Sequence, residues 1–372
     1  NTYEDVTGTG NTLDLGYPPG LRLALDALRH WVTAYGVDGF RFDLAATLLR
    51  AEGQAGESAF LAAVAQDPIL SGVKLIAEPW DLGMGGYRLG TFPSPWREWN
   101  DRFRDTVRDA FRSRPGVLPE LATRATGSSD VFGQRLRPTA SINFVTAHDG
   151  PTLADLVSYQ RKHNEANGEA NHDGGHDQRA WNGGVEGPSD DPAIVDERAR
   201  RLRSILALTL LSRGVPMLSG GDELGRTQLG NTNAYCQDTE ISWYDWANVD
   251  DTLINFTRHL IALKRAQLSL APDAWLTGEP GDDGRRDAEW FGVDGSPVAD
   301  WHQPGLSVLG LRLAGEPDVV TIVNTGSVEV EVQLPEPEWD LHLDTSRTPI
   351  EPRRIEESVT VAGFGLVLLA KA

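Results

Sequence analysis

The chain has 372 residues, of which 40% are hydrophobic and 24% are charged, and its formal net charge at pH 7 is -20. This length and composition are typical of a globular protein that is large enough for two domains. The excess of acidic side chains and the lack of a basic patch argue against a nucleic-acid partner, and no stretch reaches the ~20 apolar residues of a membrane-spanning helix.

The first expected elements surround a short buried strand at residues 37–43. Amphipathic segments at residues 21–35 and 44–65 flank this strand, and such alternation of helix and strand is typical of a parallel α/β sheet. Because side chains alternate between the two faces of a strand, Arg41 and Asp43 share one face.

Asp43 lies at the carboxyl end of this strand, which is the end where parallel barrels carry their chemistry. The neighbouring positive charge of Arg41 is expected to favour the ionised carboxylate of Asp43. An ionised acid at this place is a candidate nucleophile. The alternative hypothesis is an Arg–Asp pair that only closes the end of the strand.

More strands and helices are expected along the next 200 residues. Buried strands are expected at residues 73–77, 96–100, 141–147 and 215–218, and helices at residues 101–112, 194–212 and 252–267. Glu78 and Trp80 follow the first of these strands, and His148 and Asp149 follow the third. A long polar loop at residues 163–191 is of a kind that is usually functional or disordered.

The pattern changes at about residue 269, where helical periodicity ends. Short alternating runs follow, and strands are expected at residues 307–313, 319–323, 328–334 and 358–369. This pattern predicts an antiparallel β-sandwich. We place the boundary near Leu270, which divides the chain into domains of residues 1–269 and 270–372.

Three acids stand at the carboxyl ends of separate parallel strands, namely Asp43, Glu78 and Asp149. Because these ends meet at one edge of a parallel sheet, the three side chains are expected to converge. Cleavage of a glycosidic bond needs an ionised carboxylate beside the anomeric carbon and a protonated acid beside the leaving oxygen. A structural or metal-holding cluster is the alternative. His148 would supply a hydrogen-bond donor for a sugar hydroxyl.

The sequence blocks around these acids resemble a known family. The runs G-F-R-F-D at residues 39–43, A-E-P-W-D at residues 77–81 and F-V-T-A-H-D-G at residues 144–150 resemble the three catalytic blocks of the α-amylase superfamily. Finer matches resemble the bacterial glycogen debranching enzymes and isoamylases; they are T-G-T-G-N-T at residues 7–12, K-H-N-E-A-N-G-E at residues 162–169, W-N-G-G-V-E-G at residues 181–187 and G-N-T-N-A-Y-C-Q-D at residues 230–238.

The resemblance implies a role for each acid. Asp43 would be the nucleophile, Glu78 the general acid/base and Asp149 the residue that stabilises the transition state. The implied reaction is retaining hydrolysis through a covalent glycosyl-enzyme, in which Glu78 first protonates the leaving oxygen and then deprotonates water.

Three flanking residues also receive implied roles. Arg41 would orient the nucleophile, His148 would bind hydroxyls of the sugar at the cleavage point, and Trp80 would line the site near the leaving group. The implied substrate is an α-glucan with α-1,6 branches, such as glycogen or a limit dextrin, and no cofactor is implied. An α-1,4-acting relative and a non-catalytic glucan-binding remnant are the alternatives.

The resemblance also implies a fold, a TIM (β/α)8 barrel, of which this chain carries about five βα units. They would be strands 4–8, followed by the C-terminal β-sandwich. The family's earlier motif, an Asp and an Asn–His pair, has no match ahead of Asn1. We therefore expect an N-terminally truncated chain whose unpaired strand edges need another chain or self-association.

Other residues are weaker candidates. His172 and His176 have metal-pair spacing, but they lie in a Gly-rich loop, and we expect no metal there. Cys236, the single cysteine, excludes an intrachain disulfide, suits a reducing compartment such as the cytoplasm, and is expected to be a buried thiol. Asp222 and Glu223 either contact substrate or cap the turn that follows them.

Overall fold

The structure is a computed structural model; it describes residues 3–50, 58–133, 135–266, 273–282, 284–336 and 338–371. The chain divides into two compact units. One comprises residues 1–100 and 130–142, and the other comprises residues 101–129 and 143–372. The expected domain boundary near Leu270 lies outside the described residues, so a division at that point stays a prediction.

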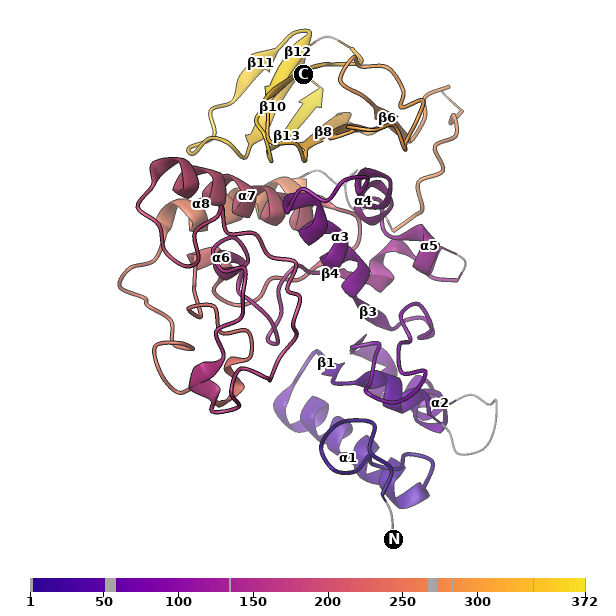
Figure 1. Ribbon diagram of the computed structural model, residues 1–372. Coiled ribbons are helices and arrows are strands. Elements are labelled where there is room, and N and C mark those ends of the chain that lie inside the picture. Colours follow the sequence, from indigo (N-terminus) through magenta and orange to yellow (C-terminus); the bar gives the residue numbers. More distant parts are fainter. Residues whose placement is uncertain are drawn as a thin grey trace. The chain divides into compact units, whose positions relative to one another are not determined.

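The first unit contains a parallel sheet with helices beside it (Figure 1). Its elements are α1 (Pro18–Tyr35), β1 (Gly39–Phe42), the 3-10 helix η1 (Ala45–Leu49), α2 (Ala59–Gln66), the 3-10 helix η2 (Leu70–Gly72), β2 (Lys74–Ala77) and β3 (Arg97–Asn100). β1 pairs in parallel with β2, and β2 pairs in parallel with β3. The expected parallel α/β arrangement is confirmed for these strands.

The chain then reaches β4 (Ser141–Asn143) through two short elements, α5 (Ser129–Phe132) and the 3-10 helix η3 (Pro138–Ala140). β4 lies next to β3 in the sheet order. The expected strand at residues 141–147 is therefore shorter than predicted, because its last four residues leave the ladder.

Local chemistry explains where α1 and β1 begin and end. Pro18 stands in the first turn of α1, where the missing N–H is not needed, and Gly36 ends the helix in a left-handed conformation. β1 begins at Gly39, where a Cβ atom would lie 2.4 Å from the carbonyl oxygen of Lys74. Only a residue without a side chain lets β1 approach β2 this closely.

The aromatic face of β1 is covered by α2, as the alternation predicts. The ring of Phe42 lies with its centroid 5.8 Å from that of Phe60 in α2 and 5.0 Å from that of Trp96. Phe60 and Trp96 are both buried. This aromatic cluster holds β1 in place and leaves its other face, with Arg41, for the site.

The expected helix at residues 44–65 is wrong. Leu44 takes a left-handed conformation, with φ of 42°, and leads into η1. A new helix, α2, begins after Ser58, whose side-chain oxygen accepts a hydrogen bond from the Leu61 N–H. Such an N-cap starts a new helix, so the structure has two short elements, η1 and α2, in place of the single expected helix. Residues 51–57 lie outside the described residues.

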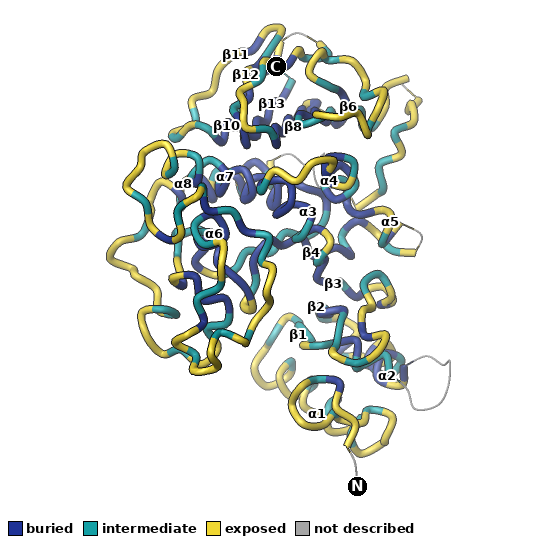
Figure 2. Tube along the Cα trace, in the orientation of Figure 1, coloured by how far each residue is buried: buried dark blue, intermediate teal, exposed yellow. Residues whose placement is uncertain are grey.

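The second unit contains a layer of helices. They are α3 (Asp101–Phe111), α4 (Leu118–Ala125), α6 (Leu153–Leu156), α7 (Pro192–Leu211) and α8 (Asp251–Ala266). α3 contacts α4 and α7, and α7 contacts α8. The C-terminal half of α7 is buried, whereas α8 buries only one side (Figure 2). The short strand β5 (Val215–Pro216) follows α7, and the next N–H, that of Met217, bonds the Asn143 carbonyl at 2.8 Å.

The last part of the second unit is antiparallel. A six-stranded sheet has the order β11 (Arg353–Ile355), β10 (Trp339–Asp344), β13 (Leu366–Lys371), β8 (Val319–Asn324), β7 (Val308–Leu313) and β6 (Ala288–Phe291). A two-stranded sheet pairs β12 (Ser358–Val361) with β9 (Val330–Gln333). One face of the larger sheet packs on α4 and α7, and its other face shares a core with β9 and β12.

The expected single strand at residues 358–369 is also wrong, because it is β12 and β13, which belong to different sheets. The chain turns between them at Gly363 and Phe364. A Cβ atom on Gly363 would lie 2.3 Å from the Ser327 carbonyl oxygen, and Phe364 has φ of 55°. In the part of the chain that the structure describes, no helix is long and apolar enough to cross a membrane.

Candidate active site

Asp43 and Glu78 stand next to each other at the carboxyl ends of two paired strands. Phe42 is the register partner of Ala77, so the residues that follow them are neighbours. The Glu78 N–H donates to the Phe42 carbonyl at 3.1 Å, and the Ala45 N–H donates to the Glu78 carbonyl at 2.9 Å. These backbone bonds fix the two acids at one edge of the parallel sheet.

Arg41 bridges the two carboxyl groups. Its guanidinium group donates a hydrogen bond to Asp43 Oδ1, and its Nη2 atom lies 3.0 Å from Glu78 Oε1. The same guanidinium carbon lies 4.1 Å from the centroid of the Trp99 ring. A cation held over an aromatic face and between two carboxyl groups has a fixed orientation.

The two acids have different surroundings. The side chain of Asp43 is 70% exposed, whereas that of Glu78 is 3% exposed. Glu78 Oε2 accepts a hydrogen bond of 2.6 Å from the N–H of Leu44, the residue after Asp43. One carboxyl group therefore faces solvent, and the other is enclosed by protein.

The loop after β2 is held by an ion pair that the sequence did not reveal. Both oxygens of Asp81 accept hydrogen bonds of 2.7 Å from Arg50. Trp80 directly precedes Asp81 in the chain and is half-buried. Its backbone N–H donates to the Glu78 carbonyl at 2.9 Å. The bidentate pair fixes the backbone on which Trp80 stands.

A second buried acid, Glu98, supports the neighbouring loop. Its oxygens accept hydrogen bonds from the N–H groups of Gly90 at 2.7 Å and Phe92 at 3.3 Å. Burial raises the pKa of Glu98 to about 8. Glu98 is therefore largely uncharged at neutral pH and serves to shape the loop.

His148 and Asp149 belong to the second unit and lie in the loop after β4. Both side chains are exposed, and His148 Nδ1 lies 3.7 Å from Asp149 Oδ1. The backbone that leads to them is anchored at Val145, whose carbonyl accepts two hydrogen bonds from buried Arg108, at 2.6 and 2.9 Å. Burial is the main reason why the pKa of Arg108 is lowered to about 9.

Asp222 holds this loop in place by hydrogen bonds. It is buried and accepts hydrogen bonds from the Thr146 hydroxyl and from the Leu153 N–H, the latter at 2.9 Å. Burial raises the pKa of Asp222 to about 6. Glu223, by contrast, accepts from the Gly221 N–H at 3.0 Å and caps its own turn. The sequence left two roles open for these acids, contact with substrate or capping of the turn. Asp222 is buried and Glu223 is half-buried, so neither side chain is exposed for contact with substrate.

A polar hollow of about 320 Å³ lies beside Asp149 in the second unit. Its lining combines guanidinium and carboxylate groups: Arg104, Asp105, Arg108, Phe144, Ala147, Asp149, Gly175, Asp177, Gln178 and Arg179. Donors and acceptors of this kind can bind the hydroxyl groups of a sugar.

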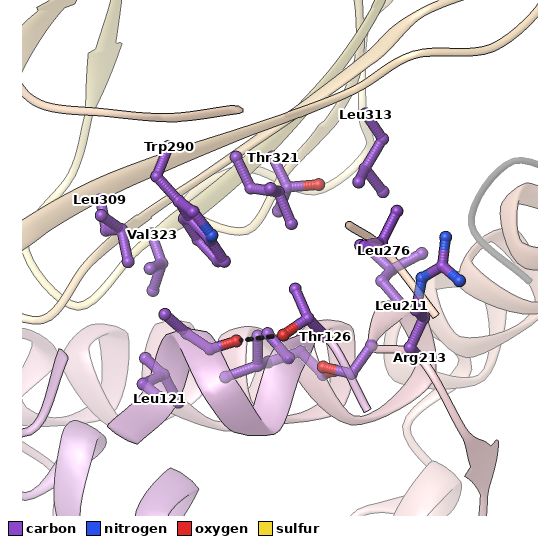
Figure 3. A pocket seen from close by; sticks show the side chains of 15 residues that line it. Leu121, Thr126, Leu211, Arg213, Leu276, Trp290, Leu309, Leu313, Thr321 and Val323 are labelled. Atoms are coloured by element: carbon purple, nitrogen blue, oxygen red, sulfur yellow. Dashed lines mark hydrogen bonds between the residues drawn. The ribbon is translucent and has the colours of Figure 1, made fainter. Parts of the chain in front are cut away.

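A second hollow has the opposite character (Figure 3). It lies where α4 and α7 meet β7 and β8, and leucine side chains, Trp290 and Val323 line it. Thr126, Arg213 and Thr321 also line it, and none of the described residues that line it carries a carboxyl group. Its volume is about 50 Å³. It is too small and too apolar for a sugar unit.

Two loop motifs that the sequence singled out are joined to each other. The His163 N–H donates to the Gly230 carbonyl at 2.8 Å, and the Thr232 N–H donates to Asn164 Oδ1 at 2.8 Å. Further links are the bonds from Asn167 Nδ2 and Asn233 Nδ2 to Asp173 Oδ2, at 2.7 and 2.9 Å. The resemblance pointed to both motifs without showing that they bind one another.

Three weaker candidates from the sequence, His172, His176 and Cys236, are exposed in the structure. No three His, Cys, Asp or Glu side chains among the described residues are grouped so that they could hold a metal ion. His172 and His176 are both exposed. The expectation of a buried thiol is wrong, because Cys236 is exposed. It lies in a polar loop whose aromatic neighbour, Tyr235, also faces solvent.

Comparison with known proteins identifies relatives, although no protein-family model matches the chain. The chain is 51% identical over 322 residues to the glycogen operon protein GlgX homolog of Mycobacterium tuberculosis strain H37Rv; the match covers 84% of the chain and 45% of that protein. It is 44% identical over 342 residues to the glycogen debranching enzyme of Serratia proteamaculans, with 91% of the chain and 50% of that enzyme covered. The chain thus spans about half the length of the curated relatives it matches.

Solved structures agree on the fold. Pullulanase from Bacillus acidopullulyticus matches the whole chain and 42% of its own, with a TM-score of 0.73 and 20% identity. Type I pullulanase from Bacillus subtilis, solved with maltose, matches with a TM-score of 0.72 and 24% identity, and 49% of that chain is covered. At such identities the likeness concerns the fold alone.

Proposed function

Because the chain is homologous to bacterial glycogen debranching enzymes of the α-amylase superfamily over about half of their length, we propose that it carries the catalytic acids of such an enzyme. The proposed reaction is hydrolysis of α-1,6 branch linkages in glycogen or limit dextrins, with retention of the anomeric configuration. The proposed substrate is therefore an α-glucan.

The proposed mechanism has two steps. In the first, a carboxylate oxygen of Asp43 attacks the anomeric carbon while Glu78 donates its proton to the leaving glycosidic oxygen. In the second, Glu78 takes a proton from water, and the water oxygen attacks the anomeric carbon and releases Asp43. Asp149 interacts with the positive charge that develops on the sugar in both transition states.

Within the structure, the observation that carries this proposal is the Arg41 bridge. It joins an exposed carboxyl group to a buried one at adjacent strand ends. A difference in environment between two neighbouring carboxyl groups is what separates a nucleophile from an acid/base in retaining glycosidases. A purely structural ion pair would not need one partner to remain in solvent.

The flanking residues are proposed as substrate contacts. His148 would donate to hydroxyls of the sugar at the cleavage point, and the polar hollow beside Asp149 offers further partners for hydroxyl groups. Trp80, on the backbone fixed by Arg50 and Asp81, would line the side of the leaving group.

The finer architecture is part of the same proposal. The parallel strands would be strands 4–8 of a (β/α)8 barrel within residues 1–269, and residues 270–372 would form a β-sandwich. Support comes from the likeness to pullulanases and from the two antiparallel sheets that share a core. The remaining barrel units would come from a further segment, or the open edges would be covered by self-association. A cytoplasmic location is proposed from the glycogen-related relatives.

An assay of bond preference tests the function. Residues 1–372 would be co-expressed with the segment of the Serratia proteamaculans enzyme that this chain does not match, and reducing ends would be measured. Release from glycogen limit dextrin, with none from unbranched amylose, is expected. Release from amylose alone would assign an α-1,4-acting enzyme, and release from neither would leave glucan binding without catalysis.

A further inference from the structure

Three aromatic side chains lie close together on the surface of the second unit. The residues Trp243 and Trp246 are 58% and 70% exposed, and Tyr244 between them is also exposed. The rings of Tyr244 and Trp246 stack at 13°, with centroids 5.5 Å apart. One exposed aromatic residue needs no explanation, but a stacked pair beside a further tryptophan is typical of a binding surface.

The protein holds these rings in place. The Tyr244 hydroxyl donates to the Gly220 carbonyl at 2.8 Å, and the Arg226 guanidinium carbon lies 4.9 Å from the Tyr244 ring centroid. Trp243 Nε1 donates to Asp238 Oδ1 at 2.9 Å. Rings that are fixed before binding lose little conformational entropy when a ligand packs on them.

We propose that Trp243, Tyr244 and Trp246 form an aromatic platform that binds a segment of an α-glucan chain away from the bond that is cleaved. The C–H faces of pyranose rings pack on aromatic faces, while the hydroxyl groups at their edges stay free to hydrogen-bond. Among the described residues none accepts a hydrogen bond from Trp246 Nε1, so this donor is available to a sugar hydroxyl.

The charge around the platform favours a neutral ligand that donates hydrogen bonds. Residues 227–257 contain five acids and no lysine or arginine, whereas Arg226, just before this stretch, packs its guanidinium group against the Tyr244 ring. Carboxylates such as that of Asp245, next to Trp246, accept hydrogen bonds from hydroxyl groups but repel phosphates. A polyhydroxylated, uncharged chain fits this surface, whereas nucleic acid does not.

Residues 220–222 hydrogen-bond both to the platform and to the loop that carries His148 and Asp149. Tyr244 bonds to Gly220, and two residues later Asp222 bonds to Thr146, which precedes His148 and Asp149. One short segment thus positions both the platform and the loop with His148 and Asp149. The choice of an α-glucan as ligand rests on the proposed function.

The test measures binding without turnover, in the Asp43→Asn background. Affinity electrophoresis in gels that contain glycogen, and calorimetry with maltoheptaose, would compare Trp246→Ala with Trp31→Ala. Trp31, 49% exposed on α1 with its ring centroid 4.7 Å from that of Tyr35, is a control of the same residue type outside the platform. Trp246→Ala is expected to weaken binding about tenfold, the usual effect of losing one aromatic anchor. Trp31→Ala should bind as the parent does, and Trp246→Phe should retain most of the affinity.

The outcomes are separable from those of the hydrolysis assay, because no bond needs to be cleaved. Equal binding by the parent, Trp246→Ala and Trp243→Ala would overturn the platform, as would a parent that binds neither glucan. A change in oligomeric state on Trp246→Ala with unchanged glucan binding would assign the surface to a protein partner instead. If the completed enzyme with Asp43 intact hydrolyses neither glucan while binding at the platform is observed, only the proposed function is overturned.

Discussion

Replacement of Asp222 by asparagine should make the stability of the protein less dependent on pH. Burial raises the pKa of Asp222 from 3.8 to about 6. The folded state therefore holds a proton between about pH 4 and pH 6 that the unfolded state has lost, and stability falls as the pH rises through this window. A rise of about two pKa units corresponds to a penalty of about 3 kcal/mol above pH 6.

Asparagine keeps the contacts without this penalty. Its Oδ1 atom can accept from the Leu153 N–H, and its amide group can donate to the Thr146 hydroxyl oxygen. Alanine loses both contacts and leaves a buried N–H without a partner, which costs about 1–3 kcal/mol. It also frees Thr146, so hydrolysis should fall on the order of 100-fold through misplacement of Asp149.

Urea unfolding at a series of pH values between 4 and 8 measures the effect, since other acids titrate equally in parent and variant. The free energy of unfolding of Asp222→Asn minus that of the parent should rise between pH 4 and 6 and stay constant above. A difference that does not change with pH would refute the assignment of a buried, charged Asp222. Unchanged hydrolysis by Asp222→Ala would refute its role in supporting the loop.

Four further predictions follow from the first unit. Asp43→Asn should lower hydrolysis of limit dextrin by about 10⁴-fold or more with an unchanged circular dichroism spectrum, because the exposed side chain is not needed for folding. Glu78→Gln should slow limit dextrin hydrolysis far more than hydrolysis of an α-glucosyl fluoride, whose leaving group needs no proton; equal losses would exclude the acid/base role. Arg41→Lys should lower turnover on the order of 100-fold, since a lysine cannot bridge both carboxyl groups, and an unaffected kcat would contradict the bridge. Glu98→Gln should gain stability over the parent between pH 4.5 and 8, where the raised pKa of Glu98 makes the parent progressively less stable, and a constant difference in urea midpoints would contradict a buried acid.

Local pattern was sufficient for the longer elements. The expected helices at residues 21–35, 194–212 and 252–267 match α1, α7 and α8 within a few residues, because apolar periodicity over three or more turns is a strong signal. Asp43 and Glu78 could be placed at strand ends because each directly follows a short run typical of a buried strand. Their adjacency then followed from the rule that parallel strands carry their carboxyl ends at one edge.

Features that depend on distant partners were missed. The contact of Arg41 with Trp99 joins residues of different strands, and no local pattern indicates it. The turn at Gly363, imposed by the Ser327 backbone, split an expected strand because only the neighbouring segment makes a Cβ atom impossible there. Asp222 was left undecided since its burial comes from tertiary packing alone.

The most direct test of the proposed debranching reaction is time-resolved proton NMR of a singly branched maltooligosaccharide treated with the co-expressed, completed enzyme. We expect the α-1,6 anomeric signal to be lost and the new reducing end to appear first as the α anomer, before mutarotation. Loss of α-1,4 signals instead, or a β anomer as the first product, would contradict it.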